Sequence, residues 1–266
     1  DLGAMPLRIY ATADGNAAAL ESLCKGGLYR HASGRLQMRA VKLYADGALG
    51  SRGAAMLEDY SDDHGNRGLL LMSAQELADG NRLTLDTYAH ALGKDAAGDH
   101  RWRVEHAQIL APADLSRFAG MHVIASMQPT HATSDMPWAQ ERVGTQRIVG
   151  AYAWRQLRDS GARLAFGSDF PVESVDPRLG LYSAVSRADG EGKPAGGWMP
   201  QEKLTAYEAL RAFTLDAAYA GFAESELGSL APGKRADFVV LAQDPLAVPD
   251  AVLKALTVLA TYVDGK

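Results

Sequence analysis

Three side chains in this sequence could together bind a metal ion, and each lies near the end of a β-rich run. Lys42 is inside RAVKLYADG, His106 ends RWRVEH, and Asp169 follows RLAFGS. Nitrogen and oxygen donors of this kind suit zinc or a similar divalent cation. Because the carboxyl ends of strands in a parallel α/β fold open on one face, we expect the three side chains to converge there.

Each of the three residues also has a purely structural interpretation. Lys42 could extend from the rim of the sheet or pair with Asp46. His106 could be a hydrogen-bonded core histidine, and Asp169 could cap the turn that follows it. Spacing alone shows neither an HxH nor an HExxH motif. Taken one at a time, these residues therefore leave the metal site open.

The elements that would position these residues alternate along the chain. Runs with β character are expected at 7–12, 39–44, 101–106, 122–127 and 163–167. Helices are expected at 81–92, 112–119 and 145–160, and another should begin near Thr205, which forms a capping-box spacing with Glu208. The alternation predicts a parallel α/β architecture. It does not decide whether the sheet closes into a barrel.

The C-terminal part differs in character. From residue 228 the sequence GSLAPGKRADFVVLAQDP contains a Pro-Gly turn followed by a strand, Asp237–Leu241. A second strand, Thr257–Val263, ends in the turn pair Asp264-Gly265. We therefore predict a main domain over 1–227 and part of a small β-domain over 228–266.

Composition excludes several classes of function. The net charge is -5 and 22% of the residues are charged, so no electrostatic attraction to nucleic acid or an anionic membrane is expected. The single cysteine, Cys24, excludes an internal disulfide framework and a zinc site built from several thiolates. One free cysteine fits a reducing cytoplasm, which is the expected location. Whether the protein forms a homo-oligomer is left open.

Four segments carry a family resemblance when they are read together. VKLYADGALGSRGAA, WRVEHAQIL, FGSDFPVES and GSLAPGKRADFVVLAQDP occur in this order. They resemble the amidohydrolase superfamily, and most closely amidohydrolase family 3, which includes N-substituted formamide deformylases. The resemblance runs from about Leu7 to the C-terminus. It implies a distorted TIM (β/α)8 barrel flanked by a small β-sandwich that both chain ends build.

The resemblance also implies roles for individual residues. Lys42 matches a lysine that can be carboxylated and bridge two metal ions, His106 matches a metal ligand, and Asp169 matches an aspartate that binds metal and accepts the proton of the attacking water. The implied cofactor is one or two divalent ions, most simply zinc. All three residues would therefore be both ligands and members of the catalytic machinery.

Four further residues are candidates for contact with substrate. Asp46 and Arg52 lie in the loop after the strand that carries Lys42, and a guanidinium there could bind a substrate carboxylate. A surface salt bridge is the alternative for Arg52. Gln128 and His131 follow the run 122–127 and would reach the same face.

The sequence departs from the family pattern in two places. The family opens with an HxH pair on the first barrel strand, and the seven histidines here include no such pair. A short helix capped by Ser73 is broken at Gly80, where the family has a fifth strand ending in histidine. Since a barrel lacking several strands would expose apolar edges, we expect these residues to belong to a longer polypeptide. The alternative is a true truncation, whose site would lack most of the ligands and bind no metal.

The function predicted from the sequence is hydrolysis of a non-peptide C–N bond in a small amide, N-formyl or N-acyl substrate by metal-activated water. Two alternatives remain at this point. The chain could be a catalytically inactive barrel that acts as a binding protein, which tight metal uptake would contradict. Lys42 could also form a Schiff base in a lyase, which inhibition by chelators would contradict.

Overall fold

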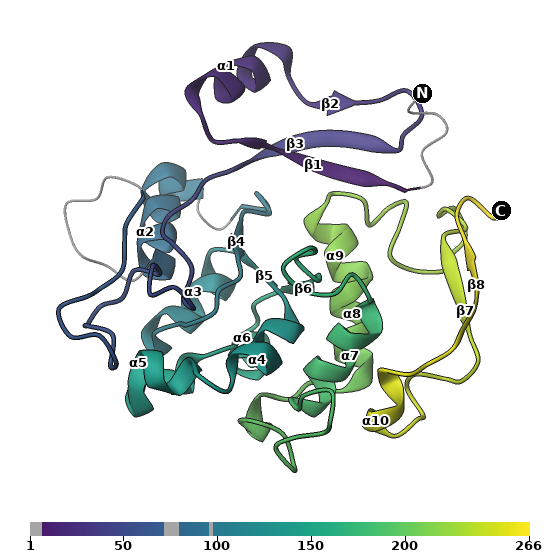
Figure 1. Ribbon diagram of the computed structural model, residues 1–266. Coiled ribbons are helices and arrows are strands. Elements are labelled where there is room, and N and C mark those ends of the chain that lie inside the picture. The colour runs from purple at the N-terminus through teal and green to yellow at the C-terminus, as the bar shows by residue number, and fades with distance from the viewer. Residues whose placement is uncertain (1–6, 72–79, 96–97) are drawn as a thin grey trace.

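The computed structural model describes residues 7–71, 80–95 and 98–266, and they form a mixed α/β structure (Figure 1). Its strands make three separate sheets in these ranges, not a closed barrel. In the first, β1 (Ile9–Asp14) pairs in parallel with β3 (Leu36–Lys42), and β2 (Tyr29–Arg30) pairs antiparallel to β3. The second sheet is all parallel, in the order β4 (Arg103–Glu105), β5 (Ile124–Met127), β6 (Leu164–Phe166). The third is the hairpin of β7 (Phe238–Leu241) and β8 (Val258–Tyr262).

Every strand predicted above is present, with its ends shifted by a few residues. The predicted short helix at Ser73 and the site of the missing strand fall largely on residues 72–79, outside the described residues. The domain boundary at 227/228 stays a prediction. Among the described residues, no helix combines the length and apolar character that crossing a bilayer requires.

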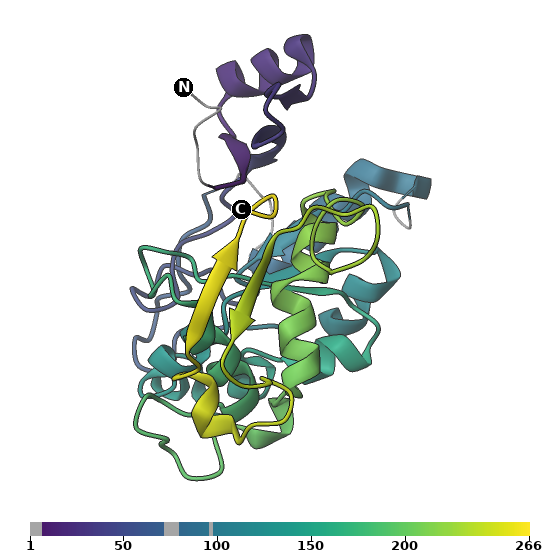
Figure 2. The same ribbon diagram turned by 90° about the vertical axis from the view of Figure 1, so that its right-hand side faces the viewer.

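The helices are divided unequally between the sheets. The β1–β3–β2 sheet carries α1 and stands out from the rest of the molecule in both ribbon views (Figures 1 and 2). The remaining helices belong to the larger body around β4–β6. The helix bounds are α1 (Ala17–Gly26), α2 (Gly80–Leu92), α3 (Leu115–Gly120), α4 (Pro129–Asp135), α5 (Ala139–Arg147), α6 (Trp154–Asp159), α7 (Pro177–Ser186), α8 (Ala206–Phe213), α9 (Leu215–Ala220) and α10 (Asp250–Leu253).

Most of the helix predictions hold. Residues 81–92 lie in α2, and 112–119 form a 3-10 turn that leads into α3. The capping box at α8 is complete, because the Thr205 hydroxyl accepts from the Glu208 N–H and the Glu208 carboxylate accepts from the Thr205 N–H.

The single helix predicted over 145–160 is wrong, because the chain breaks it into α5, a 3-10 turn and α6. The break comes from pairing with the loop after β4. The Gly150 carbonyl accepts the Leu110 N–H at 3.0 Å, and the Tyr152 N–H donates to the Gln108 carbonyl at 2.7 Å. These tertiary hydrogen bonds replace helical ones, which a periodicity argument from one segment does not detect.

The two faces of the β4–β5–β6 sheet have different surroundings. Alternate residues on one face, among them Val104, Met127 and Phe166, are buried in the main core beneath the helices. The other face carries Glu105, Ser126, Gln128 and their neighbours and lines a cavity of about 290 Å³. The first face therefore packs into the main core, and the second carries polar side chains beside a small apolar cluster of Ile124, Ala165 and Ala220.

Arginine and aromatic side chains join the β1–β3–β2 sheet to the parallel sheet. Arg101 lies between the rings of Tyr219 and Phe222, with its guanidinium carbon 3.9 and 4.4 Å from their centroids. Arg163 lies 3.9 Å from the Tyr219 ring, and Arg39 of β3 lies 4.0 Å from the Phe222 ring. Cation–π contacts of this type contribute about 0.5–2 kcal/mol each. They attach β3, and with it Lys42, to the segment that follows α9.

The terminal segments are joined by ion pairs. Arg8, just before β1, pairs with Asp237 at 2.6 Å and also with Asp264 at the end of the β7–β8 hairpin. Arg35 pairs with Asp264 at 2.9 Å. The hairpin is therefore bound to the strand that opens the described chain.

Substituting Gly150 tests the contact that breaks the predicted helix. A Cβ at Gly150 would lie 1.8 Å from the Leu110 carbonyl oxygen, so the loop after β4 would have to move. We expect Gly150→Ala to lower the free energy of unfolding by about 1–3 kcal/mol or more, the usual cost of overpacking, measured by urea denaturation. Gly120→Ala at the end of α3 is the control, because a Cβ there meets nothing within 4 Å. Equal stability of the two variants would contradict the packing argument.

Candidate metal site

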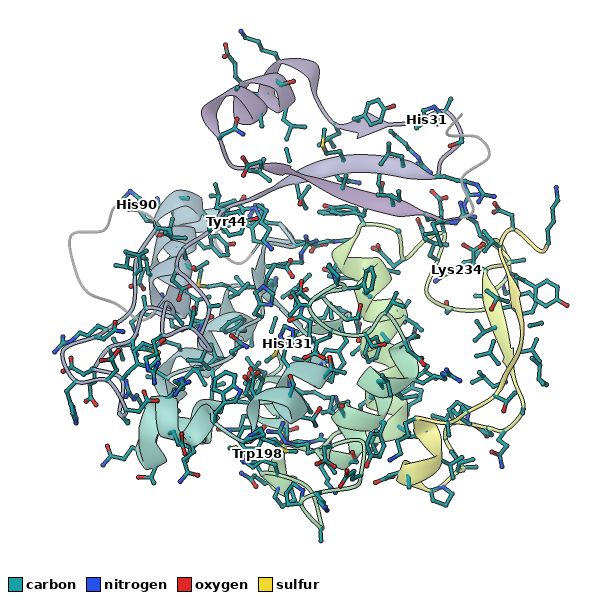
Figure 3. The ribbon with its side chains drawn as sticks, in the orientation of Figure 1. His31, Tyr44, His90, His131, Trp198 and Lys234 are labelled. Carbon is teal, nitrogen blue, oxygen red and sulfur yellow. The ribbon has the colours of Figure 1, made fainter. Side chains whose placement is uncertain are left out.

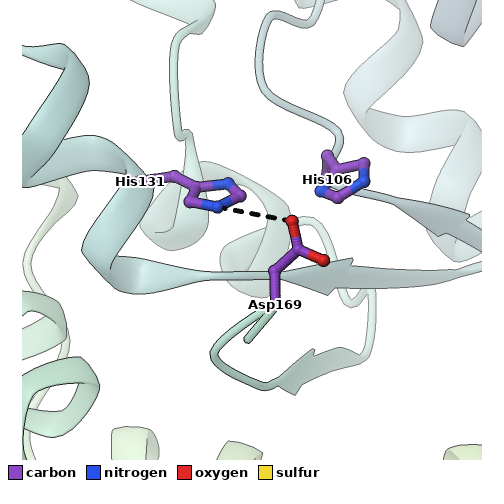
Figure 4. A group of neighbouring side chains, drawn as sticks. All are labelled: His106, His131 and Asp169. Carbon is purple, nitrogen blue, oxygen red and sulfur yellow. Dashed lines mark ion pairs between the residues drawn. The ribbon is translucent and has the colours of Figure 1, made fainter. Parts of the chain in front are cut away.

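Three side chains from different segments meet at the carboxyl edge of the parallel sheet. His106 follows β4, His131 lies in the first turn of α4 after β5, and Asp169 follows β6. Each offers a ligand atom, and these atoms all lie within 4.8 Å of one another (Figure 4). We call His106, His131 and Asp169 the His–His–Asp cluster. Two of its members were expected as ligands, and His131 was expected to contact substrate.

Unusual backbone conformations aim two of these side chains. His106 has φ of 71°, and its N–H still continues the sheet by donating to the Ser126 carbonyl at 2.7 Å. Asp169 has φ of 57°, and its carbonyl accepts the Val172 N–H at 2.8 Å. Left-handed conformations are uncommon for residues other than glycine and concentrate at functional sites. The chain therefore departs from extended geometry where the cluster forms.

His131 is the most deeply buried member of the cluster. It is 7% exposed, and neither of its ring nitrogens has a hydrogen-bond partner among the described residues. Its Nε2 lies 3.7 Å from Oδ2 of Asp169, and its ring stacks on that of His106 with centroids 5.8 Å apart. Figure 3 shows it in the interior of the larger body. Burial, together with the nearby His106, lowers the pKa of His131, so the imidazole is neutral at pH 7. A neutral imidazole is the form that binds metal ions.

Gln128 supports the cluster from the neighbouring strand end. Its amide oxygen lies 2.9 Å from Nδ1 of His106, and the residue is 8% exposed. It also lines the cavity over the polar face of the sheet. Gln128 thus reaches the candidate metal site directly, and its predicted contact with substrate stays a prediction.

Lys42 belongs to a different sheet from the three strands whose ends carry the cluster. Lys42 ends β3 in the other sheet, where its Nζ lies 5.2 Å from the centroid of the Tyr44 ring. Tyr44 lies near the junction between the two bodies (Figure 3). The predicted carboxylation and metal bridging by Lys42 stay predictions.

Asp46 and Arg52 both have partners in the described structure. Asp46 accepts the Ala55 N–H at 2.9 Å, and burial raises the pKa of its carboxyl above the usual value despite that hydrogen bond. Arg52 makes two hydrogen bonds to the Asp62 carboxylate, at 3.1 and 3.0 Å. That is the surface ion pair considered as its alternative, and substrate contact by either residue stays a prediction.

A second group of polar side chains, which we did not predict, lies beside the cluster. Asp135 accepts from the Tyr152 hydroxyl and from the Gln108 amide, the latter at 3.1 Å. The Ser134 hydroxyl donates to Glu173 at 2.6 Å, and Glu173 acts electrostatically on both Asp135 and His131. One signal was available in the sequence, because Asp135 lies four residues after His131 and so shares its helix face.

The ionisation of Asp135 gives a pH dependence with a definite sign. Burial is the largest cause that raises the pKa of Asp135, to about 6, against about 3.9 in an unfolded chain. Between about pH 4 and pH 6 the folded state therefore holds a proton on Asp135 that the unfolded chain has released. The stabilisation from the neutral carboxyl is lost as pH rises through about 6. Asp135→Asn cannot ionise and still accepts from Tyr152. We expect its unfolding temperature, relative to the wild type, to rise between pH 4 and 7; a constant difference would contradict the assignment.

The chain matches one protein family over nearly its whole length. The model of the Amidohydrolase family matches residues 2–266. Among curated proteins, LONG AFTER FAR-RED 3 of Arabidopsis thaliana is 36% identical over 87% of this chain and 43% of its own length. YtcJ of Bacillus subtilis, named as an amidohydrolase, is 33% identical over 87% of this chain and 47% of its own. N-substituted formamide deformylase of Arthrobacter pascens is 33% identical over 69% and 33%.

A solved structure extends the likeness to the fold. A metal-dependent hydrolase from Pyrococcus horikoshii superposes with a TM-score of 0.78 at 30% identity, over 91% of this chain and 52% of that one. The chain therefore spans between about a third and a half of the length of these relatives. Its α/β fold is that of the metal-dependent hydrolases, and the chain belongs to the amidohydrolase superfamily, in amidohydrolase family 3.

Proposed function

We propose that this chain belongs to a metal-dependent hydrolase in which His106, His131 and Asp169 hold a divalent cation. The observation that carries the proposal is the convergence of these three side chains at one strand edge, with ligand atoms within 4.8 Å of one another. Two imidazoles and a carboxylate form a donor set that suits zinc. Membership of a hydrolase family supports the same conclusion.

The state of His131 fits a metal ligand. A buried nitrogen without a hydrogen-bond partner costs about 1–3 kcal/mol, and both ring nitrogens of His131 are in that position. Coordination by one of them would offset part of this cost. The carboxylate of Asp169, 3.7 Å from Nε2, supplies the negative charge that a cation bound between them needs.

The chemistry that we propose is hydrolysis of a non-peptide C–N bond. A bound divalent ion supplies a Lewis acid and lowers the pKa of water towards neutrality. In this proposal Asp169 would accept a proton from the attacking water and return it to the leaving nitrogen. The name of N-substituted formamide deformylase, a relative 33% identical, supports an amide, N-formyl or N-acyl substrate.

Three further residues complete the proposal as expected from the sequence. Lys42, once carboxylated, would provide an oxygen ligand to a second ion. Arg52 and Asp46 would contact substrate in the loop after β3. In the structure Lys42 lies beside the ring of Tyr44, and Arg52 pairs with Asp62.

Removing a cluster imidazole should remove the metal. We expect the purified protein to take up zinc after dialysis, and we expect bound zinc per chain in His106→Ala and His131→Ala to fall to background, because each change deletes a ligand. Atomic emission spectroscopy measures the content. His122→Ala is the control, since that histidine is exposed and outside the cluster. Zinc retained equally in all variants would exclude the cluster as the site, and no uptake by the wild type would favour the inactive barrel.

Replacing the proposed proton acceptor should stop turnover. Asp169→Asn conserves volume but removes the basic carboxylate, so we expect a loss of about 10²–10⁴-fold in kcat. Amine release from a panel of N-formyl and N-acyl amines measures it, with circular dichroism as the check on folding. Activity near that of the wild type would exclude the role assigned to Asp169.

A further inference from the structure

Gln128 holds one of the two ring nitrogens of His106, and this contact has a consequence for the metal site. The amide oxygen of Gln128 lies 2.9 Å from Nδ1 of His106. An amide oxygen only accepts hydrogen bonds, so Nδ1 must carry the proton. In a neutral imidazole the other nitrogen, Nε2, then has the lone pair. The hydrogen bond therefore selects which nitrogen is able to bind a cation.

We propose that Gln128 is a positioning residue, which fixes the tautomer and the ring orientation of His106 so that Nε2 is the metal-binding nitrogen. The part of this inference that concerns metal affinity rests on the proposed function. The part that concerns the tautomer rests only on the contact between the two side chains. Gln128 is thus assigned to the ligand, whereas the sequence suggested contact with substrate.

Several features of the structure make Gln128 suitable for this role. It is 8% exposed, so water competes little for its oxygen. Its backbone is extended at the N-cap position of α4, directly after β5, and the Pro129 that follows restricts its conformation. β5 pairs in register with β4, and the His106 N–H donates to Ser126, two residues before Gln128. The backbone of the sheet therefore sets the separation between the two side chains.

His106 needs such a partner because of its own backbone. With φ of 71° it has left the strand conformation, so the pleat of β4 no longer sets the direction of its side chain. The hydrogen bond that His106 donates to the Gln128 amide oxygen supplies the missing constraint. Partners of this kind hold metal-binding histidines in many proteins, and their loss typically lowers metal affinity about 10–100-fold.

Three variants separate positioning from simple packing. Gln128→Met keeps the length of the side chain and removes the amide oxygen. Gln128→Glu keeps an acceptor at the same place. Gln37→Met is the matched control, because the Gln37 amide donates to the Gly221 carbonyl at 3.1 Å, in the β1–β3–β2 sheet and outside the cluster.

The first readout is the tautomer of His106 in metal-free protein labelled with ¹⁵N-histidine. Long-range ¹H–¹⁵N spectra report which ring nitrogen carries the proton, and the His106→Ala spectrum identifies the signal. We expect the proton on Nδ1 in the wild type, in Gln128→Glu and in Gln37→Met, and a shift towards the Nε2–H form in Gln128→Met. A proton on Nε2 in the wild type, or an unchanged tautomer in Gln128→Met, would overturn the proposal.

The second readout is zinc affinity, measured by competition with a chromogenic chelator. We expect Gln128→Met to bind zinc about 10–100-fold more weakly than the wild type. Gln128→Glu keeps the acceptor and Gln37→Met lies outside the cluster, so we expect the zinc affinity of both to stay within about threefold of the wild type. Equal affinity in Gln128→Met and the wild type would overturn the positioning role. If the wild type binds no zinc, the proposed function fails, and the tautomer alone then decides the role of Gln128.

Discussion

The backbone hydrogen bonds between β4, β5 and β6 hold three strand ends at one edge, and the candidate site is built on that edge. Arg103 pairs with Ile124 and Ala125 with Leu164, so the three strands run in parallel with little offset. Each strand is only three or four residues long. Side chains such as Val104 and Phe166 anchor the sheet to the helices and fix its position. The residues beyond the strand ends are then free to leave extended geometry.

The site combines several groups that are unfavourable on their own. His106 and Asp169 have left-handed backbones, which cost of order 1–3 kcal/mol at strained non-glycine positions. His131 is buried, and within the described part of the chain neither ring nitrogen has a hydrogen-bond partner. A fold retains such features where the surrounding packing enforces them, and here the buried helix and sheet core does so. Two strained backbones and an unpartnered buried imidazole therefore occur together in the described part of this edge.

A feature of the fold or the site could be predicted from the sequence where it depends on residues that are neighbours along the chain. The strands were found because β-rich runs such as HVIASM are continuous in the sequence, and His106 and Asp169 were found because they follow such runs. The break near Gly150 could not be found, since it depends on hydrogen bonds to Gln108 and Leu110, about forty residues away. The position of His131 in the cluster depends on where α4 begins, which the run before it does not determine.

Lys42 belongs to a strand, β3, that is held by contacts other than those of the parallel sheet. β3 is attached to the rest of the molecule through Arg39, which lies on the ring of Phe222, and through Gln37, which donates to Gly221. Both contacts involve the segment after α9, and Arg101 ties this segment to the start of β4. The attachment therefore lies near the amino end of β4, whereas Lys42 is at the carboxyl end of β3. The arginine and aromatic side chains therefore join the two sheets on the amino side of Lys42, away from the carboxyl edge that carries the His–His–Asp cluster.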